Sequence, residues 1–388
     1  MKVLIAIDSF KGSLSSIEAS RAVDLGIKEV FPQAEIVKLP LADGGEGTVE
    51  ALLHAVGGDS IDTTVVGPLS APKKAQYGIL TNGNTAVIEV AEACGLAHIP
   101  VDQRNPLLAT TFGVGQLILD AIEKGCREFI IGLGGSATND GGVGMLQALG
   151  FRFLDEENRE VGRGGKELKK IRSVDLSQVI PELATCHFRI ACDVNNVLYG
   201  PTGAAPIFGP QKGATPEMVE SLDAGLKNFA EVVWEQLGID LQNLPGAGAA
   251  GGLGAAFSGF LQADLESGIE LILELTAMEE KMQGVDFVIT GEGKLDDQTA
   301  MGKAPLGVAQ LAAKKGIPVI ALAGAVPADA SILNGLGITS CFSILNAPMS
   351  LEEAMNSEVA FNNLRGTAKQ LFGLVQGVIK KEGNLQNR

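Results

Sequence analysis

Apolar and polar positions alternate along this chain in two different styles. Near the N-terminus, the apolar run 2–8 has the length and β-branching of a buried strand, and an amphipathic helix pattern follows over 16–31. A second strand is predicted at 34–41 and a second helix at 49–56. Because strands and helices alternate here, we expect the chain to begin with a parallel sheet.

The second style appears between residues 59 and 91. Short β-branched runs are separated there by turn residues, and Asn82-Gly83 between two of these runs is typical of a hairpin. These strands are expected to be antiparallel, which favours a separate second domain.

Elements of both kinds continue to the C-terminus. In the middle region the patterns predict helices at 111–124, 145–149 and 216–237, a hairpin at 151–161, strands at 128–132 and 187–193, and further helix up to residue 281. The C-terminal region predicts strands at 285–290, 317–323 and 338–345, a loop at 291–299, and helices at 305–315 and 351–380.

The return of the first style near the C-terminus predicts how the chain is divided. We expect a doubly wound parallel-sheet domain built from residues 1–60 and 285–388. An α/β domain with mixed strands is inserted at 61–284, with the active site in the cleft between the two. Two consecutive domains are the alternative. A chain of 388 residues is longer than one hydrophobic core usually serves.

Composition and charge narrow the class of protein. Hydrophobic residues make up 46% of the chain, so it can bury large cores, and a net charge of −16 opposes binding to nucleic acid and to anionic lipid. The five cysteines are widely spaced without a CxxC pair, which indicates neither a disulfide framework nor a zinc site. No stretch has the length of a membrane span or of a signal sequence, so we expect a cytoplasmic protein.

Glycine is the outlier of the composition, with 50 residues grouped in a few loops. Such clusters mark backbone that needs positive φ or that approaches a ligand closely. The longest cluster, 132–142 (GLGGSATNDGG), follows a predicted strand and has the hydroxyls and successive N–H groups of a phosphate cradle. Tight strand–helix packing would explain one or two of these glycines, but hardly the whole run. The candidate phosphate ligands in it are Gly134, Gly135, Ser136, Thr138 and Asn139.

Two loops near the N-terminus place carboxylates at the ends of predicted strands. Asp8, Ser9 and Lys11 follow the first strand, at the position where open α/β sheets bind ligands. Asp43 and Glu46 follow the second strand in DGGEGT. Asp43 could orient the hydroxyl groups of a substrate, and Glu46 could do the same or help to hold Mg²⁺. The structural alternatives are a strand-terminal turn with a surface lysine and N-capping of the next helix.

Two further candidates lie in the middle region. Asp193 ends the strand at 187–193, where it could act as a general base, bind Mg²⁺, or simply form an Asx-turn. Lys212 is a loop cation that could meet a phosphate, although a solvated lysine explains it equally well.

The acidic loop TGEGKLDDQT at 290–299 is the candidate metal site. Glu292, Asp296 and Asp297 provide three carboxylates within six residues, as for a hard cation completed by water and phosphate oxygens. Lys303, just before the next predicted helix, could reach a phosphate. An acidic surface loop is the alternative.

The segment 246–251 matches the GxGxxG pattern of dinucleotide-binding proteins. It does not follow a predicted strand, and no acidic residue lies at the expected distance beyond it. An NAD-dependent oxidoreductase is therefore only a distant alternative. A glycine-rich helix entry near a ligand, or close helix packing, fits this segment better.

Together, these loops resemble those of the type-1 glycerate kinase family, bacterial enzymes that phosphorylate D-glycerate with ATP. The resemblance covers essentially the whole chain, and the one mild departure is at 195–198 (NNVL), where the family usually shows Asn-Pro-Leu. The matching stretches are 8–16, 41–48, 132–150, 192–196, 210–214, 246–254, 290–299 and 302–305.

The resemblance implies a Rossmann-like domain with a second α/β domain, and a reaction in which ATP and Mg²⁺ phosphorylate D-glycerate to 2-phosphoglycerate. Phosphorylation of the 3-hydroxyl, or of another small hydroxy acid, is the alternative. The GHMP kinases share a GLGSSA-type loop but lack the DGGEGT and acidic loops, and a non-catalytic anion-binding protein would not need the acidic loop. We expect a monomer or a homodimer.

The roles that follow from this resemblance are hypotheses, guided by the need of phosphoryl transfer for positioning and charge stabilisation. The candidate catalytic residues are Lys11, Lys303 and Asp193, with Asp193 as the base for the glycerate hydroxyl. The candidate glycerate ligands are Asp8, Ser9, Lys11, Asp43 and Glu46. The candidate ATP and phosphate ligands are Gly134, Gly135, Ser136, Thr138, Asn139 and Lys212. The candidate Mg²⁺ ligands are Glu292 and Asp296.

Overall fold

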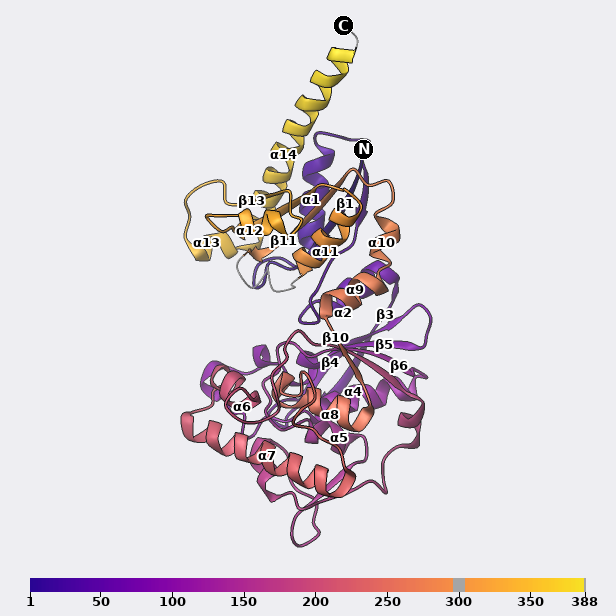
Figure 1. Cartoon of the computed structure of the whole chain (residues 1–388), viewed down its shortest axis with the longest axis vertical. Helices are drawn as coiled ribbons and strands as arrows, with labels where there is room; N and C mark the ends of the chain where they lie inside the picture. The colour runs from indigo at the N-terminus through magenta and orange to yellow at the C-terminus, as the bar shows by residue number, and fades with distance from the viewer. Residues whose placement is uncertain (296–303, 387–388) are drawn as a thin grey trace. The chain divides into compact units, whose positions relative to one another are not determined.

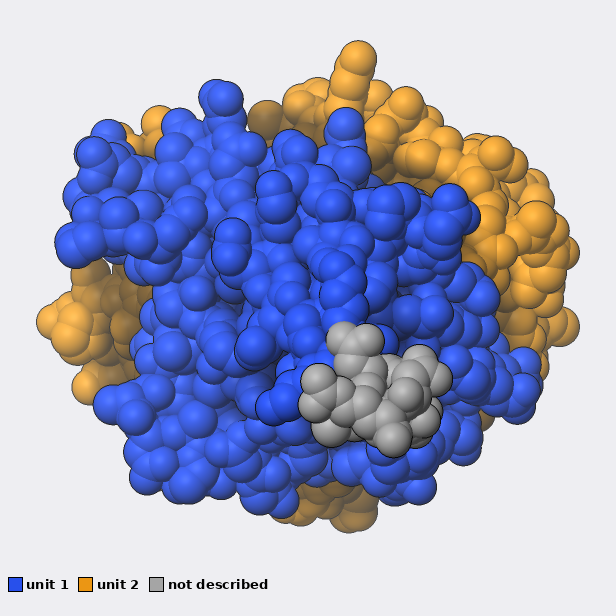
Figure 2. Space-filling model, turned by 90° about the horizontal axis from the view of Figure 1, so that it is seen from above, with its two compact units in different colours: residues 1–43, 269–388 blue, residues 44–268 orange. Residues whose placement is uncertain are grey.

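The computed structural model describes residues 1–295 and 304–386 of the chain (Figure 1). The chain forms two compact units, which are coloured separately in Figure 2. Unit 1 combines Met1–Asp43 with Ile269–Arg388, and unit 2 is Gly44–Gly268. No helix in the described ranges carries an apolar stretch of the length that a bilayer crossing requires.

Unit 1 contains a five-stranded sheet in which every neighbouring pair of strands is parallel. The strand order is β13-β12-β11-β1-β2. Strand β2 lies on one side of β1, and β11, β12 and β13 follow one another on the other side of β1. The order therefore reverses between β1 and β11, which makes their carboxyl ends the topological switch point. The strands are β1 (Lys2–Ile7), β2 (Glu35–Lys38), β11 (Phe287–Lys294), β12 (Val319–Ala325) and β13 (Ser340–Ser343).

Helices cover the central strands β1, β11 and β12 of this sheet, which are largely buried, whereas the edge strands β2 and β13 are partly exposed. Val3, Ile5 and Ile7 of β1 form one core with the apolar stripes of α1 and α14, and α11 packs against β1, β11 and β12. Ser15 caps α1 in a capping box with Glu18. The helices of unit 1 are α1 (Ser16–Lys28), α9 (Gly268–Leu275), α10 (Met278–Lys281), α11 (Ala304–Lys314), α12 (Ser331–Gly335), α13 (Leu351–Met355) and α14 (Ser357–Gln386).

Unit 2 is built on a six-stranded mixed sheet of order β10-β9-β6-β5-β4-β3. Strands β3, β4 and β5 are antiparallel, whereas β5, β6, β9 and β10 are parallel. The hairpin predicted at Asn82-Gly83 joins β4 to β5, with Gly83 at a φ of +68°. The strands are β3 (Gly58–Val66), β4 (Pro72–Leu80), β5 (Thr85–Glu89), β6 (Glu128–Gly132), β9 (His187–Ala191) and β10 (Asp264–Glu266).

A single large apolar core lies between this sheet and its helices, and it includes the fully buried Phe153, Phe229 and Phe257. Unit 2 also contains a small antiparallel sheet, formed by β7 (Arg152–Leu154) and β8 (Ser173–Asp175). The helices of unit 2 are α2 (Thr48–Val56), α3 (Val90–Cys94), α4 (Phe112–Glu123), α5 (Val143–Ala148), α6 (Ala204–Phe208), α7 (Pro216–Leu237) and α8 (Leu253–Leu261).

The fold prediction is confirmed: both chain ends build a doubly wound parallel sheet, and the other unit has mixed strands. Several local predictions are wrong. The region up to 281, predicted to be helical, contains strand β10, which is held to β9 by the ion pair between Arg189 and Glu266 at 2.7 Å. A three-residue strand is too short to show a period in the sequence.

The start of the loop predicted at 291–299 is also wrong, because β11 continues to Lys294 by pairing with β12. Glycine lowers the strand propensity of GEGK, and the ladder to β12 overrides it. The hairpin predicted at 151–161 is present: Leu154 and Glu160 form a bridge, and the amide of Val161 donates to the carbonyl of Phe153 at 2.8 Å, while β7 forms its ladder with β8. The helix predicted at 351–380 is two helices, α13 and α14, separated at Asn356.

Candidate active site

Two carboxylates lie at the switch point of the parallel sheet in unit 1. The amide of Asp8 donates to the carbonyl of Gly291 at 2.9 Å, which continues the register of β1 and β11 by one residue and sets Asp8 opposite Glu292. Asp8 is 4% exposed and Glu292 is 7% exposed. Alternation along the two strands points both side chains to the same face of the sheet.

Lys11 and Asp43 complete this group. The ammonium of Lys11 lies 3.6 Å from the carboxylate of Asp43, and Ser9 donates its backbone N–H to Asp8 at 2.6 Å. Three carboxylates therefore share one ammonium group. Such a group favours ligands that donate hydroxyl hydrogens or that bring a cation.

The crowding of negative charge has a consequence for Asp8. Burial, together with the nearby negative charges of Asp43 and Glu292, raises the pKa of Asp8 to about 7, although the N–H of Ser9 and the charge of Lys11 oppose this shift. The carboxyl group is thus poised to exchange a proton near neutral pH.

The donor set of unit 1 can be compared with the needs of Mg²⁺. Among the described residues, no three His, Cys, Asp or Glu side chains lie close enough together to hold a metal ion by themselves. Mg²⁺ is usually held by one or two carboxylates together with phosphate oxygens and water, so Glu292 fits as a partial ligand. The predicted site residues Asp296 and Lys303 lie outside the described residues.

In unit 2, the glycine-rich loop after β6 meets Lys212 from a distant part of the chain. Lys212 ends a short 3-10 turn (Pro210–Lys212), and its ammonium donates to the hydroxyl of Ser136 at 3.0 Å and to the carbonyl of Thr138 at 2.7 Å. The alternative of a solvated lysine is wrong, because Lys212 is only 3% exposed.

The buried charge of Lys212 has no ion pair with a carboxylate in the described part of the chain, and Asp140 acts on it only at longer range. Burial lowers its pKa to about 8. The amide of Asn139 is also fully buried, and neither its Oδ1 nor its Nδ2 has a partner among the described residues. A buried cation beside an unpaired amide favours binding of an anion or of ordered water.

The glycines of this loop have a second explanation, which the sequence reasoning underestimated. A Cβ atom at Gly134 would lie 2.7 Å from the Cα of Gly45, and one at Gly132 would overlap the carbonyl of Gly44. Cβ atoms at 141, 142 and 144 would likewise collide with or press on α7, on α8 and on Thr110. Close packing therefore accounts for most of the run, and the glycines alone are no proof of a phosphate site.

Two candidates of unit 2 have exposed side chains. Asp193 is exposed just beyond β9, and its Oδ1 accepts a hydrogen bond from the amide of Gly268 at 2.9 Å, at the start of α9. Glu46 is exposed in the turn that precedes α2. The GxGxxG segment 246–251 enters α8 without a preceding strand, and Gly251 packs on the backbone of Thr138. This agrees with the packing interpretation of that segment.

Sequence reasoning missed Glu89, the last residue of β5. It lies opposite Gly132 in the register of β5 and β6, is 7% exposed, and accepts the amide of Val49 at 2.8 Å at the start of α2. Burial, with the nearby charges of Glu92 and Glu46, raises its pKa to about 7 against the effect of two backbone N–H groups. The same signal that selected Asp8, a carboxylate at a strand end, would have found it.

Comparison with known proteins relates the whole chain to a family of enzymes. A model of the glycerate kinase family matches residues 3–376. The chain belongs to the glycerate kinase family.

Curated relatives of this glycerate kinase family member match nearly the whole chain. The glycerate kinase of Bacillus subtilis (strain 168) is 48% identical over 376 residues, which is 97% of this chain and 98% of the relative. The glycerate 2-kinase of Escherichia coli (strain K12) is 46% identical over 364 residues, which is 94% of this chain and 95% of that relative. A crystal structure of a protein from Salmonella typhimurium LT2, provisionally named glycerate kinase 2, superposes with a TM-score of 0.88 at 43% identity. It covers 98% of this chain and 99% of that chain.

Family membership confirms the resemblance found in the motifs, and it makes this chain a kinase. It also removes the oxidoreductase alternative, which depended only on the segment 246–251. The individual roles of the site residues in this glycerate kinase family member stay predictions.

Proposed function

We propose that this chain transfers the γ-phosphoryl group of ATP to the 2-hydroxyl of D-glycerate, giving 2-phosphoglycerate and ADP. The observation that carries the proposal is the group of Asp8, Lys11 and Glu292 at the switch point of the sheet, in a chain that belongs to the glycerate kinase family. The relative named as a glycerate 2-kinase favours the 2-hydroxyl.

The group in unit 1 has the chemistry to hold a small hydroxy acid. The ammonium of Lys11 would pair with the carboxylate of glycerate, and the carboxylates of Asp8 and Asp43 would accept its hydroxyl hydrogens. Ser9 would add a further hydroxyl. This assignment is supported by the 3.6 Å approach of Lys11 to Asp43 and by the shared face of Asp8 and Glu292.

Mg²⁺, when bound with ATP, would neutralise charge on the phosphate oxygens. Glu292 would hold it as one protein ligand, and the sequence prediction adds Asp296 as a second. Lys303 is proposed, from the sequence alone, to balance charge on the transferring phosphoryl group. The acidic surroundings of Glu292 fit a hard cation.

In unit 2, the loop after β6 and Lys212 are proposed to bind phosphate groups. The support is the buried ammonium of Lys212, which is held by Ser136 and Thr138 without an ion pair to a carboxylate of the described chain. Gly134, Gly135 and Asn139 belong to the same proposed cradle.

Asp193 is the proposed base for the glycerate hydroxyl, as its place beyond the end of β9 suggested. Asp8 is a second candidate, since it lies beside the residues that are proposed to hold that hydroxyl. Asparagine at either position keeps the shape of the side chain and removes the base, so the two single variants separate the candidates. Operation in the cytoplasm, as a monomer or a homodimer, stays a prediction.

The decisive experiment is a coupled assay of ADP release from ATP. Release should depend on both D-glycerate and Mg²⁺ and should stop when EDTA is added. Phosphorus NMR of the product then distinguishes 2-phosphoglycerate from 3-phosphoglycerate. Absence of glycerate-dependent release from folded enzyme would refute the proposed activity, and a 3-phosphate product would correct the position.

A further inference from the structure

A cavity of about 410 Å³ lies within unit 1, at the carboxyl ends of β1, β11, β12 and β13. Its volume falls in the range of about 300–1,000 Å³ that small-molecule sites occupy. Ligands of open α/β sheets bind at this edge, next to the switch point. A three-carbon acid would fill only a small part of this space.

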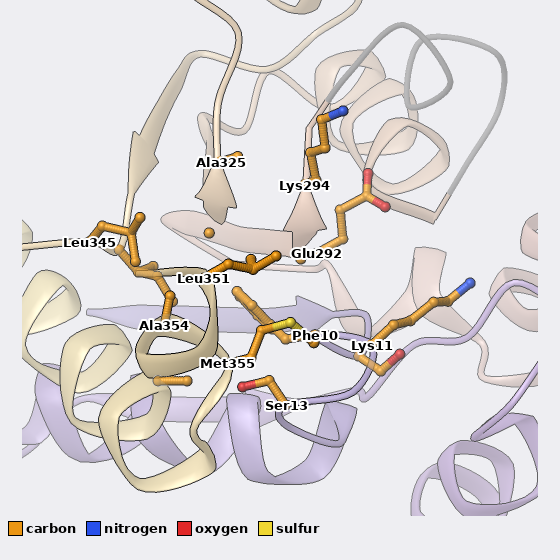
Figure 3. Close-up of a pocket in the computed structure, with 15 residues that line it drawn as sticks. Phe10, Lys11, Ser13, Glu292, Lys294, Ala325, Leu345, Leu351, Ala354 and Met355 are labelled. Carbon is orange, nitrogen blue, oxygen red and sulfur yellow. The ribbon is translucent and has the colours of Figure 1, made fainter. Parts of the chain in front are cut away.

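One side of the cavity is apolar (Figure 3). It is formed by Phe10, Leu345, Leu351, Ala354 and Met355, and two of these residues come from opposite ends of the short helix α13. That helix is held in place by a capping box between Ser350 and Glu353.

The apolar side chains of this wall are unusually accessible. Leu351 is 76% exposed, Met355 40% and Leu345 38%. Leucine and methionine gathered around a hollow mark a surface that a ligand covers. The apolar wall therefore indicates a ligand with a flat or apolar part.

The opposite side of the cavity is charged. Lys11, Glu292 and Lys294 extend there, away from the apolar wall (Figure 3). The hydroxyl oxygen of Ser13, in the wall of the cavity, is buried and has no hydrogen-bond partner among the described residues.

We propose that this cavity binds the nucleoside part of ATP, with the base against Leu351 and Met355 and the phosphates leading toward Lys294 and Lys11. The inference rests on the proposed function, because it takes the phosphoryl donor to be ATP. A nucleoside triphosphate matches the cavity in joining an aromatic base, a polar ribose and an anionic tail. Glycerate has no apolar part that would cover the wall.

The chemistry of each part supports this orientation. The thioether of Met355 is polarisable and packs well on an aromatic ring. The phosphate chain then ends beside Glu292, which is where the proposed Mg²⁺ is needed, and beside Lys11, which is proposed to hold glycerate.

The test is calorimetric titration of the full-length protein with ADP in the presence of Mg²⁺. Leu351→Glu places a negative charge on the apolar wall at an exposed position, so the variant should fold normally. Its dissociation constant for ADP should rise by about 10- to 100-fold, the effect of losing one well-covered leucine contact. Leu374→Glu is the matched control, since Leu374 on α14 is 69% exposed and lies outside the cavity. This control should bind ADP within about twofold of the wild type.

The outcomes separate this inference from the proposed function. If Leu351→Glu binds ADP as tightly as the wild type, the cavity is not the nucleotide site, even when glycerate-dependent ADP release is normal. If the wild type binds ADP and loses affinity in Leu351→Glu but shows no glycerate-dependent release, the site stands and the proposed reaction fails. An azido-ADP label found on peptides outside 344–360 would also overturn the inference.

Discussion

The ammonium group of Lys212 lies 3.0 Å from the hydroxyl oxygen of Ser136, although 76 residues separate them in the chain. The same ammonium donates to the carbonyl of Thr138 at 2.7 Å, so one buried lysine holds the loop that follows β6 by two hydrogen bonds. Since no carboxylate of the described chain forms an ion pair with it, we expect its charge to be completed by a bound anion.

Replacing Lys212 with Met should remove that anion site while filling nearly the same volume. Sulfate is a suitable probe because its charge is constant across neutral and mildly alkaline pH. We expect sulfate to raise the melting temperature of the wild type by on the order of 2–4 °C, and to do so far less in Lys212→Met. Lys227→Met, at an exposed position of α7, is the control and should respond like the wild type.

The effect of sulfate should also depend on pH. Because burial lowers the pKa of Lys212 to about 8, the ammonium loses its proton as pH rises through 8, and the stabilisation by sulfate should disappear there. Melting curves with and without sulfate test this when they are measured from about one pH unit below this pKa to about one pH unit above it. A constant effect across this range would mean that Lys212 does not bind the anion.

Glu89 should make the protein less stable as pH rises. Its pKa is raised to about 7 in the folded state from 4.5, so the folded protein holds the proton more tightly than the unfolded chain between these values. The stabilisation is complete below the unfolded pKa and is lost as pH rises through 7. Glu89→Gln keeps an acceptor for Val49 without the charge. It should therefore be more stable than the wild type at alkaline pH, by about 1–3 kcal/mol.

Urea unfolding measured from acid to alkaline pH would show this gain shrinking toward zero at low pH. Glu235→Gln, at an exposed position of α7, should show no such trend and serves as the control. A pH-independent difference between Glu89→Gln and the wild type would show that packing, rather than charge, dominates at this site.

Asp193→Asn should separate catalysis from folding. The asparagine oxygen can still accept the amide of Gly268 at the start of α9, so the free energy of unfolding should change by less than about 0.5 kcal/mol. If Asp193 is the base, turnover should fall by about 100-fold or more. Near-normal turnover with normal ATP binding would exclude Asp193 and leave Asp8 as the candidate. Asp193→Ala, which also loses the acceptor, should be less stable by about 1 kcal/mol.

Gly251→Ala should destabilise the loop after β6. Gly251 has a φ of +73°, and its added Cβ would collide with the carbonyl of Thr138. Gly238 is the control, with a φ of +69° and no atom within 4 Å of an added Cβ. We expect a cost of about 1 kcal/mol for Gly238→Ala, which isolates the conformational strain, and above about 3 kcal/mol for Gly251→Ala. Equal costs in chemical unfolding would show that the loop moves away freely.

Only some of the site residues, and none of the contacts between distant segments, could be predicted from the sequence. Asp8, Lys11 and Asp43 could be predicted as site residues, because each comes after a strand that an apolar run in the sequence predicts. The pairing of Asp8 with Glu292 could not, since it depends on the register of two strands almost three hundred residues apart. Glu292 was assigned to a loop because its glycine neighbours disfavour a strand, and only the ladder to β12 shows otherwise.

The sequence by itself determined the two styles of secondary structure, the doubly wound sheet and, through its motifs, the family. These properties depend on local periodicity, turn chemistry and residue type, which are readable along a short stretch of chain. The tertiary structure alone decided that Lys212 is buried against Ser136, that packing explains most of the glycines after β6, and that Leu351 and Met355 face a cavity with Lys294. These relationships arise from burial and strand pairing between distant segments, and no local pattern records them.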